Sequence, residues 1–378
     1  MEEIKPSRTA DVLRAQHRGT ASNRSGRYER DSRVLADDGW GSIVGGWWSE
    51  GEAVNQPPLA TTVQVDTSRS ILARNDSPDI PFDRSVNPYR GCEHGCSYCF
   101  ARPSHAWLGL SPGLDFETRL FAKPDAAPLL EQAFRARGYQ PAPLGLGTNT
   151  DPWQPVERQL RITRSVLEVL DAYSHPVAIV TKGAMIARDA DVLGRMAARG
   201  LVSVSLSVTT LDRDLSRRLE PRASTPSARL RAIRVLADAG VPVRVNAAPM
   251  IPGLNDHELD AILAAGKEAG AESAGAILLR LPQEVRELFA EWLETHVPDR
   301  AARVLSLIRQ CRDGDLNSAA FGDRMRGQGP VADLLWQRFR LAAKRAGLRM
   351  SIPTLRTDLF ACPPQKLHLK AGDQMSLF

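Results

Sequence analysis

The sequence predicts an α/β fold, a partial barrel of about six strand–helix units with an extension at each end. Short apolar runs rich in β-branched residues alternate with longer amphipathic stretches from about residue 82 onward. Several amphipathic stretches end in a glycine where the next apolar run begins, at Gly200, Gly240 and Gly270, as helix C-caps do. Apolar strands that alternate with helices form a parallel sheet with right-handed crossovers.

The predicted strands begin with residues 84–89 and continue with five apolar runs at residues 143–148, 176–182, 201–210, 241–249 and 274–282. Apolar residues recur with the helical period between these runs, which predicts helices at residues 162–173, 187–200, 226–240 and 255–270. Six units are too few to close an eight-unit barrel. The sequence therefore predicts an open (βα)6 barrel.

Changes in composition predict the domain boundaries. Residues 1–80 are rich in Arg, Ser, Asp and Gly and lack a sustained period, so we expect a largely disordered N-terminal extension there. We expect the barrel over residues 81–315 and a mostly helical C-terminal extension over residues 316–370. Residues 371–378 are expected to form a flexible tail.

Composition also narrows the class of protein. No apolar run approaches the roughly 20 residues of a membrane span, and the first residues lack the apolar core of a secretory signal. We therefore expect a cytoplasmic protein without membrane contact. The formal net charge is +5, and Lys and Arg outnumber acidic residues over residues 4–34 and 299–356. Basic ends suit an anionic partner such as nucleic acid.

Three of the five cysteines lie within eight residues, at Cys92, Cys96 and Cys99. In a reducing compartment such clustering indicates a metal site before a disulfide. Three explanations remain at this point: a structural zinc site completed by His94 or His105, buried free thiols, or an iron–sulfur cluster. Three thiolates on a four-iron cluster would leave one iron free to bind a small molecule.

Polar and conformationally special residues gather where the predicted strands end. The second run continues into GTNTDPWQP (147–155), the third ends in Thr181 and Lys182, and the fifth continues into APMIPGLND (248–256). Strand ends of a parallel barrel share one rim, where the cysteine loop also lies. This convergence predicts one functional site at the carboxyl ends of the strands.

The pattern Cys-x3-Cys-x2-Cys after the first strand, with Tyr98 before the last cysteine, resembles the radical S-adenosylmethionine (SAM) superfamily. A bacterial subfamily related to spore photoproduct lyase is similar over NPYRGCEHGCSYCFARPSHAWLGLSPGLDFE, GLGTNTDPWQPVER, SVTTLD, RLEPRA, PMIPGLND and LLRLP. The resemblance covers roughly residues 60–350. It implies a partial barrel of the TIM type, and it favours iron–sulfur chemistry over zinc.

The resemblance implies a [4Fe–4S] cluster on Cys92, Cys96 and Cys99, with SAM bound at the open iron. Reduction would cleave SAM to methionine and a 5′-deoxyadenosyl radical, which abstracts hydrogen from a substrate. A flavodoxin or ferredoxin would supply the electron. We expect a role in DNA repair or nucleic-acid modification. A protein or small-metabolite substrate is one alternative, and a zinc-stabilised nucleic-acid-binding module without catalysis is another.

Further residues are implied to contact SAM. Tyr98 would pack near the adenine, in surroundings that Pro252 and Gly253 shape. The segment GTNTD stands where the superfamily has a Gly-Gly-Glu type motif for the amino group. Its candidate residues for that contact are Thr148, Asn149 and Asp151.

The same resemblance implies which residues contact the ribose and the carboxylate of SAM. Ser205 or Ser207 would contact the ribose, and one of the two is expected to face away from it. Lys182 and Arg280 are candidates for the carboxylate. A cysteine could return a hydrogen atom to a substrate radical, and the candidates are Cys311 and Cys362.

The chain ends in QMSLF, which is similar to the short peptides that bind the bacterial sliding clamp. In such a peptide Gln374 would hydrogen-bond at a pocket edge, while Leu377 and Phe378 would enter an apolar cleft. The sequence therefore predicts a clamp partner, which agrees with a role on DNA.

Overall fold

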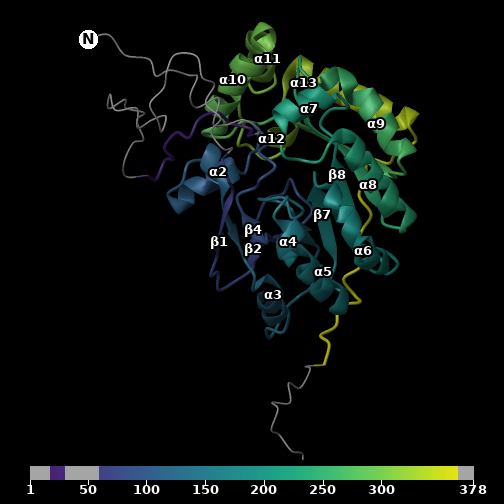
Figure 1. Cartoon of the computed structure of the whole chain (residues 1–378). Coiled ribbons are helices and arrows are strands. Elements are labelled where there is room, and N and C mark those ends of the chain that lie inside the picture. The colour runs from purple at the N-terminus through teal and green to yellow at the C-terminus, as the bar shows by residue number, and fades with distance from the viewer. Residues whose placement is uncertain (1–17, 30–58, 365–378) are drawn as a thin grey trace, which may run out of the picture.

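The computed structural model describes residues 18–29 and 59–364 of the chain (Figure 1). Within these residues the main sheet has six neighbouring parallel strands, and one antiparallel strand pairs with β3 at the edge. The strands, from the antiparallel edge, are β2 (Leu72–Arg74), β3 (Arg84–Val86), β6 (Leu144–Leu146), β7 (Val177–Thr181), β8 (Val202–Ser207), β9 (Val243–Met250) and β10 (Ser273–Leu278). The predicted partial α/β barrel is confirmed.

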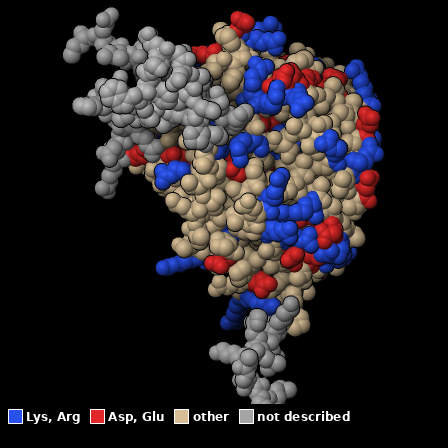
Figure 2. All heavy atoms as spheres, in the orientation of Figure 1, with Lys and Arg blue, Asp and Glu red and all other residues tan. Residues whose placement is uncertain are grey.

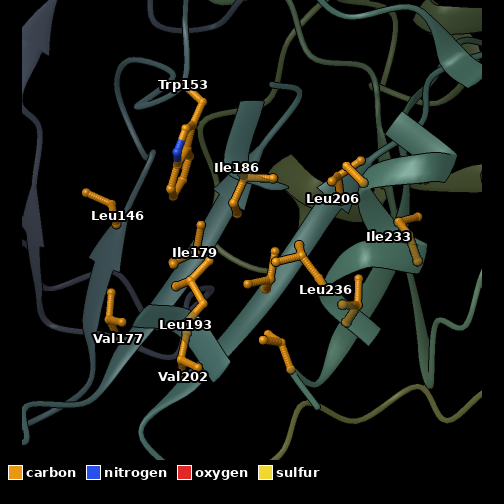
Figure 3. Close-up of a cluster of buried hydrophobic side chains, with 14 of the residues drawn as sticks. Leu146, Trp153, Val177, Ile179, Ile186, Leu193, Val202, Leu206, Ile233 and Leu236 are labelled. Atoms are coloured by element: carbon orange, nitrogen blue, oxygen red, sulfur yellow. The ribbon is translucent and has the colours of Figure 1, made fainter. Parts of the chain in front are cut away.

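Helices cover one face of this sheet (Figure 1). They are α3 (Ala126–Phe134), α5 (Ile162–Ala172), α6 (Ala190–Ala197), α8 (Pro226–Asp238) and α9 (Leu259–Glu268). Figure 3 shows Val177 and Ile179 of β7 and Leu206 of β8 in one apolar cluster with Leu193 of α6 and Leu236 of α8. These side chains are almost fully buried, so this layer forms the main core of the molecule.

Glycines end three of these helices as predicted. Gly200, Gly240 and Gly270 have φ values of 70°, 75° and 102°, the left-handed conformation that a helix C-cap requires. Shorter helical segments stand near the carboxyl ends of the strands: α4 (Glu157–Leu160), η2 (Ala184–Asp189), α7 (Arg213–Leu219) and η3 (Asp256–Glu258).

A small second sheet flanks the start of the barrel. Its strands are β1 (Thr62–Val65), β5 (Arg119–Ala122) and β4 (Tyr89–Arg90), in that order. The cysteine loop, η1 (Arg102–Leu108) and α2 (Leu114–Thr118) connect β4 to β5. The strands β1 and β2 lie inside residues 1–80, where the sequence predicted a largely disordered extension, so that extension includes ordered strands.

The C-terminal part is helical, as predicted. Its helices are α10 (Val285–His296), α11 (Pro298–Gln310), α12 (Asp323–Arg326) and α13 (Gly329–Arg345). α13 packs against α9 and β10, and thereby covers the last strand of the barrel. Among the described residues, no helix combines the length and apolar character that crossing a membrane requires.

Candidate functional site

The three clustered cysteines lie on one loop between β4 and η1. Cys92 and Cys96 are buried, and Cys99 is partly exposed and packs against the apolar groups that contain the other two. Gly95 has a φ of 64°, which lets the chain turn between the first two cysteines. All three thiols are free of disulfides. The structure therefore gathers the predicted ligands in one place.

Burial raises the pKa of all three thiols. Lys182 opposes this rise at Cys96, and Arg102 opposes it at Cys99. A bound metal would favour the thiolate forms far more strongly than these side chains do, because a coordinating thiol loses its proton. Burial thus favours the neutral form of these thiols in the metal-free protein.

The arrangement of the thiols bears on the choice between a cluster and zinc. Among the described residues, no three His, Cys, Asp or Glu side chains converge where one metal ion could bind. Tetrahedral zinc requires its sulfur ligands at about 2.3 Å from a single ion. A cluster of several irons instead accepts thiolates that are further apart. Within the described residues the three thiols therefore do not form a preformed site for a single metal ion.

The two candidate histidines have other partners. His94 Nδ1 lies 3.4 Å from Asp151 Oδ2, and His105 Nε2 lies 2.9 Å from the carbonyl oxygen of Arg119. Both imidazoles are buried. These contacts use one nitrogen of each ring and leave the other nitrogen, so they do not by themselves decide whether either histidine binds a metal.

Asp151 connects the loop after β6 to β7 and to the cysteine loop. Its carboxylate accepts hydrogen bonds from Thr181 Oγ1 and the Lys182 amide, both at 2.7 Å, and from the Trp153 amide at 2.9 Å. Burial alone would raise the pKa of Asp151, but His94 and these donors lower it to about 2. Asp151 is thus an ionised residue that holds the loop after β6 against β7 and the cysteine loop. Its carboxylate oxygens already accept hydrogen bonds from the protein.

The other candidates for the amino group differ from Asp151. The Thr148 hydroxyl and the Asn149 amide nitrogen of the main chain both face Asn87 Oδ1, at 3.4 Å and 3.0 Å. Within the described residues the carboxamide of Asn149 makes no hydrogen bond, and the residue is partly exposed. Asn149 is therefore the member of GTNTD whose side chain is available to a ligand.

A buried charge network lies beneath the cysteine loop and centres on Glu220. Its carboxylate accepts hydrogen bonds from the Tyr98 hydroxyl, from Thr209 Oγ1 at 2.6 Å and from the Arg229 guanidinium. Burial alone would raise the pKa of Glu220, but Arg229 and Lys182 lower it to about 2. The sequence segment RLEPRA contains this glutamate, but its role was not predicted because nothing in the local sequence shows that it is buried against Tyr98, which is 122 residues away.

Lys182 belongs to this network. Its ammonium lies 3.7 Å from Glu220 Oε1 and 3.2 Å from the carbonyl oxygen of Ala248, and it also faces the ring of Tyr98. These contacts make Lys182 a counter-charge for Glu220, so it is less available to a cofactor carboxylate than the sequence suggested.

Arg280, the second candidate for the carboxylate, has a different environment. Its guanidinium lies 4.4 Å from the ring centroid of Phe100, the residue after Cys99, and it makes no hydrogen bond or ion pair within the described residues. Burial, together with the nearby Arg324 and Arg312, lowers the pKa of Arg280 to about 10. Asp79 is near enough to oppose this fall but forms no ion pair with Arg280. A half-buried cation beside Cys99 without a direct carboxylate partner is suited to an anionic ligand.

The two serines of β8 require a correction. Side chains alternate along a strand, so Ser205 and Ser207, two residues apart, point to the same face. Val204 and Leu206 belong to the apolar core that faces the helices. The expectation that one of the serines faces away from the other was therefore wrong, and both lie on the inner face of the barrel.

The loop after β9 is fixed by its own hydrogen bonds. The Gly253 amide donates to Asp256 Oδ1 at 2.8 Å, with a φ of 77° at Gly253 that favours glycine. Asn255 Nδ2 donates to the carbonyl oxygen of Thr209 at 2.7 Å, which ties this loop to the end of β8. Pro252 and Gly253 thus lie at the same rim as the other candidates.

The candidate hydrogen donors lie elsewhere. Cys311 is fully buried at the end of α11 and packs with Leu278 and Leu335. Cys362 is exposed, and its Sγ lies 3.7 Å from the carbonyl oxygen of Phe134, at the end of α3 and near the amino ends of the strands. The structure therefore does not bring Cys362 to the cysteine loop. The predicted clamp-binding residues Gln374, Leu377 and Phe378 lie outside the described residues.

A partial α/β barrel with a three-cysteine loop at the carboxyl ends of its strands defines a radical SAM protein. The sequence profile of the radical SAM superfamily matches residues 86–265. The chain belongs to this superfamily, as the sequence predicted.

Two uncharacterized proteins are similar to this chain in sequence. The chain is 36% identical over 233 residues to the uncharacterized protein Rv2578c of Mycobacterium tuberculosis, covering 61% of this chain and 68% of that protein. It is 24% identical over 173 residues to the uncharacterized protein MJ0683 of Methanocaldococcus jannaschii, covering 46% of this chain and 62% of the relative.

Solved structures of spore photoproduct lyase have a similar fold. The complex with a dinucleoside spore photoproduct has a TM-score of 0.57 at 16% identity, covering 76% of this chain and 81% of that one. A mutant of the same enzyme has a TM-score of 0.55 at 17% identity, covering 77% and 82%. At this identity the likeness establishes a shared fold, and the substrate must be argued from the site.

Proposed function

We propose that the protein is a radical SAM enzyme that holds a [4Fe–4S] cluster on Cys92, Cys96 and Cys99 and acts on nucleic acid. One observation carries the cofactor assignment: three free thiols share one loop, two of them buried, and the described residues contain no group of three or more His, Cys, Asp or Glu that could hold a single metal ion. A ligand set that is one short leaves an iron for SAM. When bound, the cluster would supply the electron that cleaves SAM to methionine and a 5′-deoxyadenosyl radical.

The residues around the loop have separate tasks in this proposal. Tyr98, held by Glu220 and Thr209, would present its ring edge to the adenine side of the site. Asn149 offers the unpaired carboxamide for the amino group, and Ser205 and Ser207 offer hydroxyls on one face for the ribose. The loop at Pro252 and Gly253 would close the site from the end of β9. Burial of this rim limits the access of water to a reactive radical.

Arg280 supports an anionic ligand. It is the half-buried cation next to Cys99 that lacks a carboxylate partner among the described residues, and it stacks on Phe100, whose ring is 46% exposed. The carboxylate of SAM and a substrate phosphate are both candidates for this contact. A guanidinium stacked on an exposed aromatic ring also suits nucleic acid, because the ring can stack on a base while the cation binds phosphate.

One further observation agrees with a nucleic-acid substrate, whereas the surface charge adds no support. The similar solved enzyme is described in complex with a dinucleoside spore photoproduct. Figure 2 shows basic and acidic side chains interspersed on the face in view. Ion pairs such as that of Arg164 with Asp191 occur among the described residues. The described part of that face is thus a mixed-charge surface, and the argument for an anionic substrate rests on Arg280 at the rim. A protein or small metabolite as substrate remains the alternative.

Anaerobic reconstitution tests the cofactor assignment. Loaded protein should contain about four irons with matching sulfide, and on reduction it should release 5′-deoxyadenosine from SAM. Cys96→Ala should lose both properties and keep the barrel fold, since the main core is made by other residues. Cys362→Ala, a thiol at the other end of the strands, is the matched control and should behave as wild type. Zinc in place of iron and sulfide would contradict the assignment.

Binding measurements decide whether Arg280 contacts SAM or nucleic acid. Arg280→Gln should weaken either SAM or a labelled single-stranded DNA by roughly tenfold, the loss of one charge-assisted contact. Lys182→Gln is a comparison variant with a basic residue that already has a carboxylate partner. DNA binding that is unchanged in Arg280→Gln would assign this residue to SAM and remove the main structural support for nucleic acid.

The C-terminal QMSLF is proposed to dock on a bacterial sliding clamp. Truncation of the chain before Leu377 should abolish capture by purified clamp, while Met375→Ala should retain most of it, because the anchors are Leu377 and Phe378. Equal capture of the truncated and intact chains would rule out this partner site. The electron donor is proposed to be a flavodoxin or ferredoxin, which should replace a chemical reductant in the SAM cleavage assay.

A further inference from the structure

A segment near the N-terminus, residues 18–29, lies against the cysteine loop and is called the strap below. In Figure 1 this purple segment runs beside α2. The carbonyl oxygen of Ser22 accepts a hydrogen bond from the Leu114 amide at 3.2 Å, and Asn23 exchanges hydrogen bonds with Asp115. The sequence predicted no regular structure here, so these contacts were not expected.

The strap is bonded to a buried carboxylate, Glu117 of α2. The Gly19 amide donates to Glu117 Oε2 at 2.9 Å, and the Thr20 hydroxyl donates to Glu117 Oε1 at 3.2 Å. The Arg102 guanidinium, also buried, lies 2.5 Å from the same carboxylate. Arg102 in turn donates to the carbonyl oxygen of Cys96 at 2.9 Å. A continuous chain of hydrogen bonds thus links the strap to the middle cysteine.

The backbones of Gly19 and Gly95 touch. A Cβ atom at Gly19 would overlap the carbonyl oxygen of Gly95, and a Cβ atom at Gly95 would lie 2.5 Å from Glu117 Oε2. A side chain at Gly19 is therefore excluded while the strap is in place, and a side chain at Gly95 would displace the Glu117 carboxylate that the strap binds. Gly95 lies between Cys92 and Cys96, so the strap covers the turn that separates the first two ligands.

The strap reaches α10 at its other end. Ser22 Oγ donates to Glu291 Oε2 at 2.8 Å, and Arg27 Nε lies 2.6 Å from Glu284 Oε1. These contacts connect the cysteine loop to a helix that is about 200 residues distant in the sequence. The strap is thus anchored on both sides of the loop that it covers.

The cysteine loop has few strong hydrogen bonds of its own. The Gly95 amide is 3.4 Å from the carbonyl oxygen of Cys92, and the Cys99 amide is 3.2 Å from that of Cys96. Such turns open easily unless other segments hold them. Phe116, Gln154 and Leu219 give such support by accepting hydrogen bonds from the amides of Cys92, Glu93 and Ser97 at 2.8–3.0 Å. The strap and Arg102 add support at Gly95 and at the Cys96 carbonyl.

We propose that the strap is a positioning segment for the cluster. By holding Gly95 and, through Glu117 and Arg102, the Cys96 carbonyl, it keeps the three thiols in the arrangement that binds iron, and it slows the loss of iron. This inference rests on the proposed function, because it assumes that the cysteines hold the cluster. The strap acts on the loop and contacts neither SAM nor substrate in this proposal.

Gly19→Ala in the full chain tests the proposal, because one methyl group is enough to displace the strap. Hydrogen exchange of the metal-free variant should be at least about tenfold faster over residues 91–102, the effect of losing the bonds to Glu117. In the loaded variant, a chelator should remove iron at least about tenfold faster, and the spectrum of the reduced cluster should broaden. Thermal unfolding of the barrel should change by only a few degrees.

A milder pair of variants covers the case in which Gly19→Ala folds poorly. Thr20→Val removes one donor to Glu117 at nearly constant shape and should give a smaller acceleration, whereas Thr20→Ser keeps the hydroxyl and should restore the wild-type rates. Arg24→Ala is the control within the strap, since its ion pair with Glu287 is largely exposed and contributes little.

The outcomes separate the two proposals. If wild-type protein binds no iron and sulfide, the proposed function fails, while hydrogen exchange still reports whether the strap holds the loop. If wild-type protein binds the cluster and Gly19→Ala shows wild-type exchange and iron release, the strap proposal is overturned. Faster exchange of the loop with unchanged iron release also overturns it.

Discussion

The helix-facing side of the barrel sheet and its carboxyl-end rim are stabilised in different ways. On the helix side, apolar residues such as Val204 and Leu206 pack in a continuous core. At the rim, buried carboxylates such as Glu220 and Glu117 are each matched by an arginine. The stability of the apolar side depends on close packing and on the apolar area that it buries. The stability of the rim depends on individual ion pairs in which both partners are present.

This difference determines where the molecule tolerates substitutions. A cavity in the apolar layer costs energy in proportion to the lost contacts and leaves the rest of the layer intact. An incomplete ion pair at the rim leaves a buried charge without compensation. The rim also holds the cysteines, so its electrostatic balance and its function are coupled, whereas the apolar core mainly supplies stability.

The largest effect is expected for Glu220→Gln. The change leaves Arg229 buried without its carboxylate and replaces one of the two acceptor oxygens, which serve the Tyr98 hydroxyl and Arg229, by an NH2 group. We expect the free energy of unfolding of the metal-free protein to fall by about 3–5 kcal/mol. Urea unfolding followed by circular dichroism measures it. A loss below about 1 kcal/mol would mean that the network is not a buried ion pair of this kind.

A change in the apolar layer provides the comparison. Leu206→Ala should lower the free energy of unfolding by about 2–5 kcal/mol through the cavity that it leaves. The folded and loaded fraction should nevertheless give the wild-type cluster spectrum, because Leu206 points to the helices. Glu220→Gln should alter that spectrum through Tyr98, which lies next to Cys99. Equal spectra for the two variants would remove the distinction between the regions.

The sequence predicted the apolar layer better than the rim. The strands, the helices and the C-caps at Gly200, Gly240 and Gly270 follow from local patterns, and so does the cysteine loop. Glu220 and Glu117 were missed because their burial and pairing are decided by how separate segments pack in the fold. Arg229 donates to Glu220 from another helix, and Thr20 reaches Glu117 across 97 residues. A glutamate inside an otherwise ordinary segment carries no local sign of such a role.

A buried histidine near the amino ends of the strands, away from the rim, should make the stability of the protein depend on pH. His175 is fully buried; its Nδ1 lies 3.0 Å from the carbonyl oxygen of Pro176, and its Nε2 lies 2.8 Å from the Tyr139 hydroxyl. Burial lowers the pKa of His175 to about 4. Because the unfolded state then binds the proton more tightly, stability is complete above about pH 6.5 and falls as the pH is lowered toward 4.

Urea unfolding across this range should show the effect. His175→Phe keeps the stack on Phe134 but cannot bind a proton, so the difference in stability between wild type and variant should change by roughly 3 kcal/mol between pH 7 and 4. His105 remains in both proteins and cancels in the difference. A difference that does not depend on pH would show that His175 is not held neutral by burial.

The smallest effect is expected on the outer surface. Arg195 pairs with Asp171 across α5 and α6, but its side chain is 55% exposed. Arg195→Ala should change the free energy of unfolding by less than about 1 kcal/mol, and added salt should reduce the change further. Thermal unfolding at low and high salt checks this. A loss as large as that of Glu220→Gln would show that burial does not separate the two kinds of ion pair.

The central claim is that the cysteine loop leaves one iron of a [4Fe–4S] cluster without a protein ligand. Electron paramagnetic resonance of anaerobically loaded, reduced protein, recorded with and without SAM, tests it most directly. We expect SAM to shift the spectrum, because the cofactor would bind the open iron. An identical spectrum at saturating SAM would mean that a side chain already fills this position, and the proposed catalysis would be contradicted.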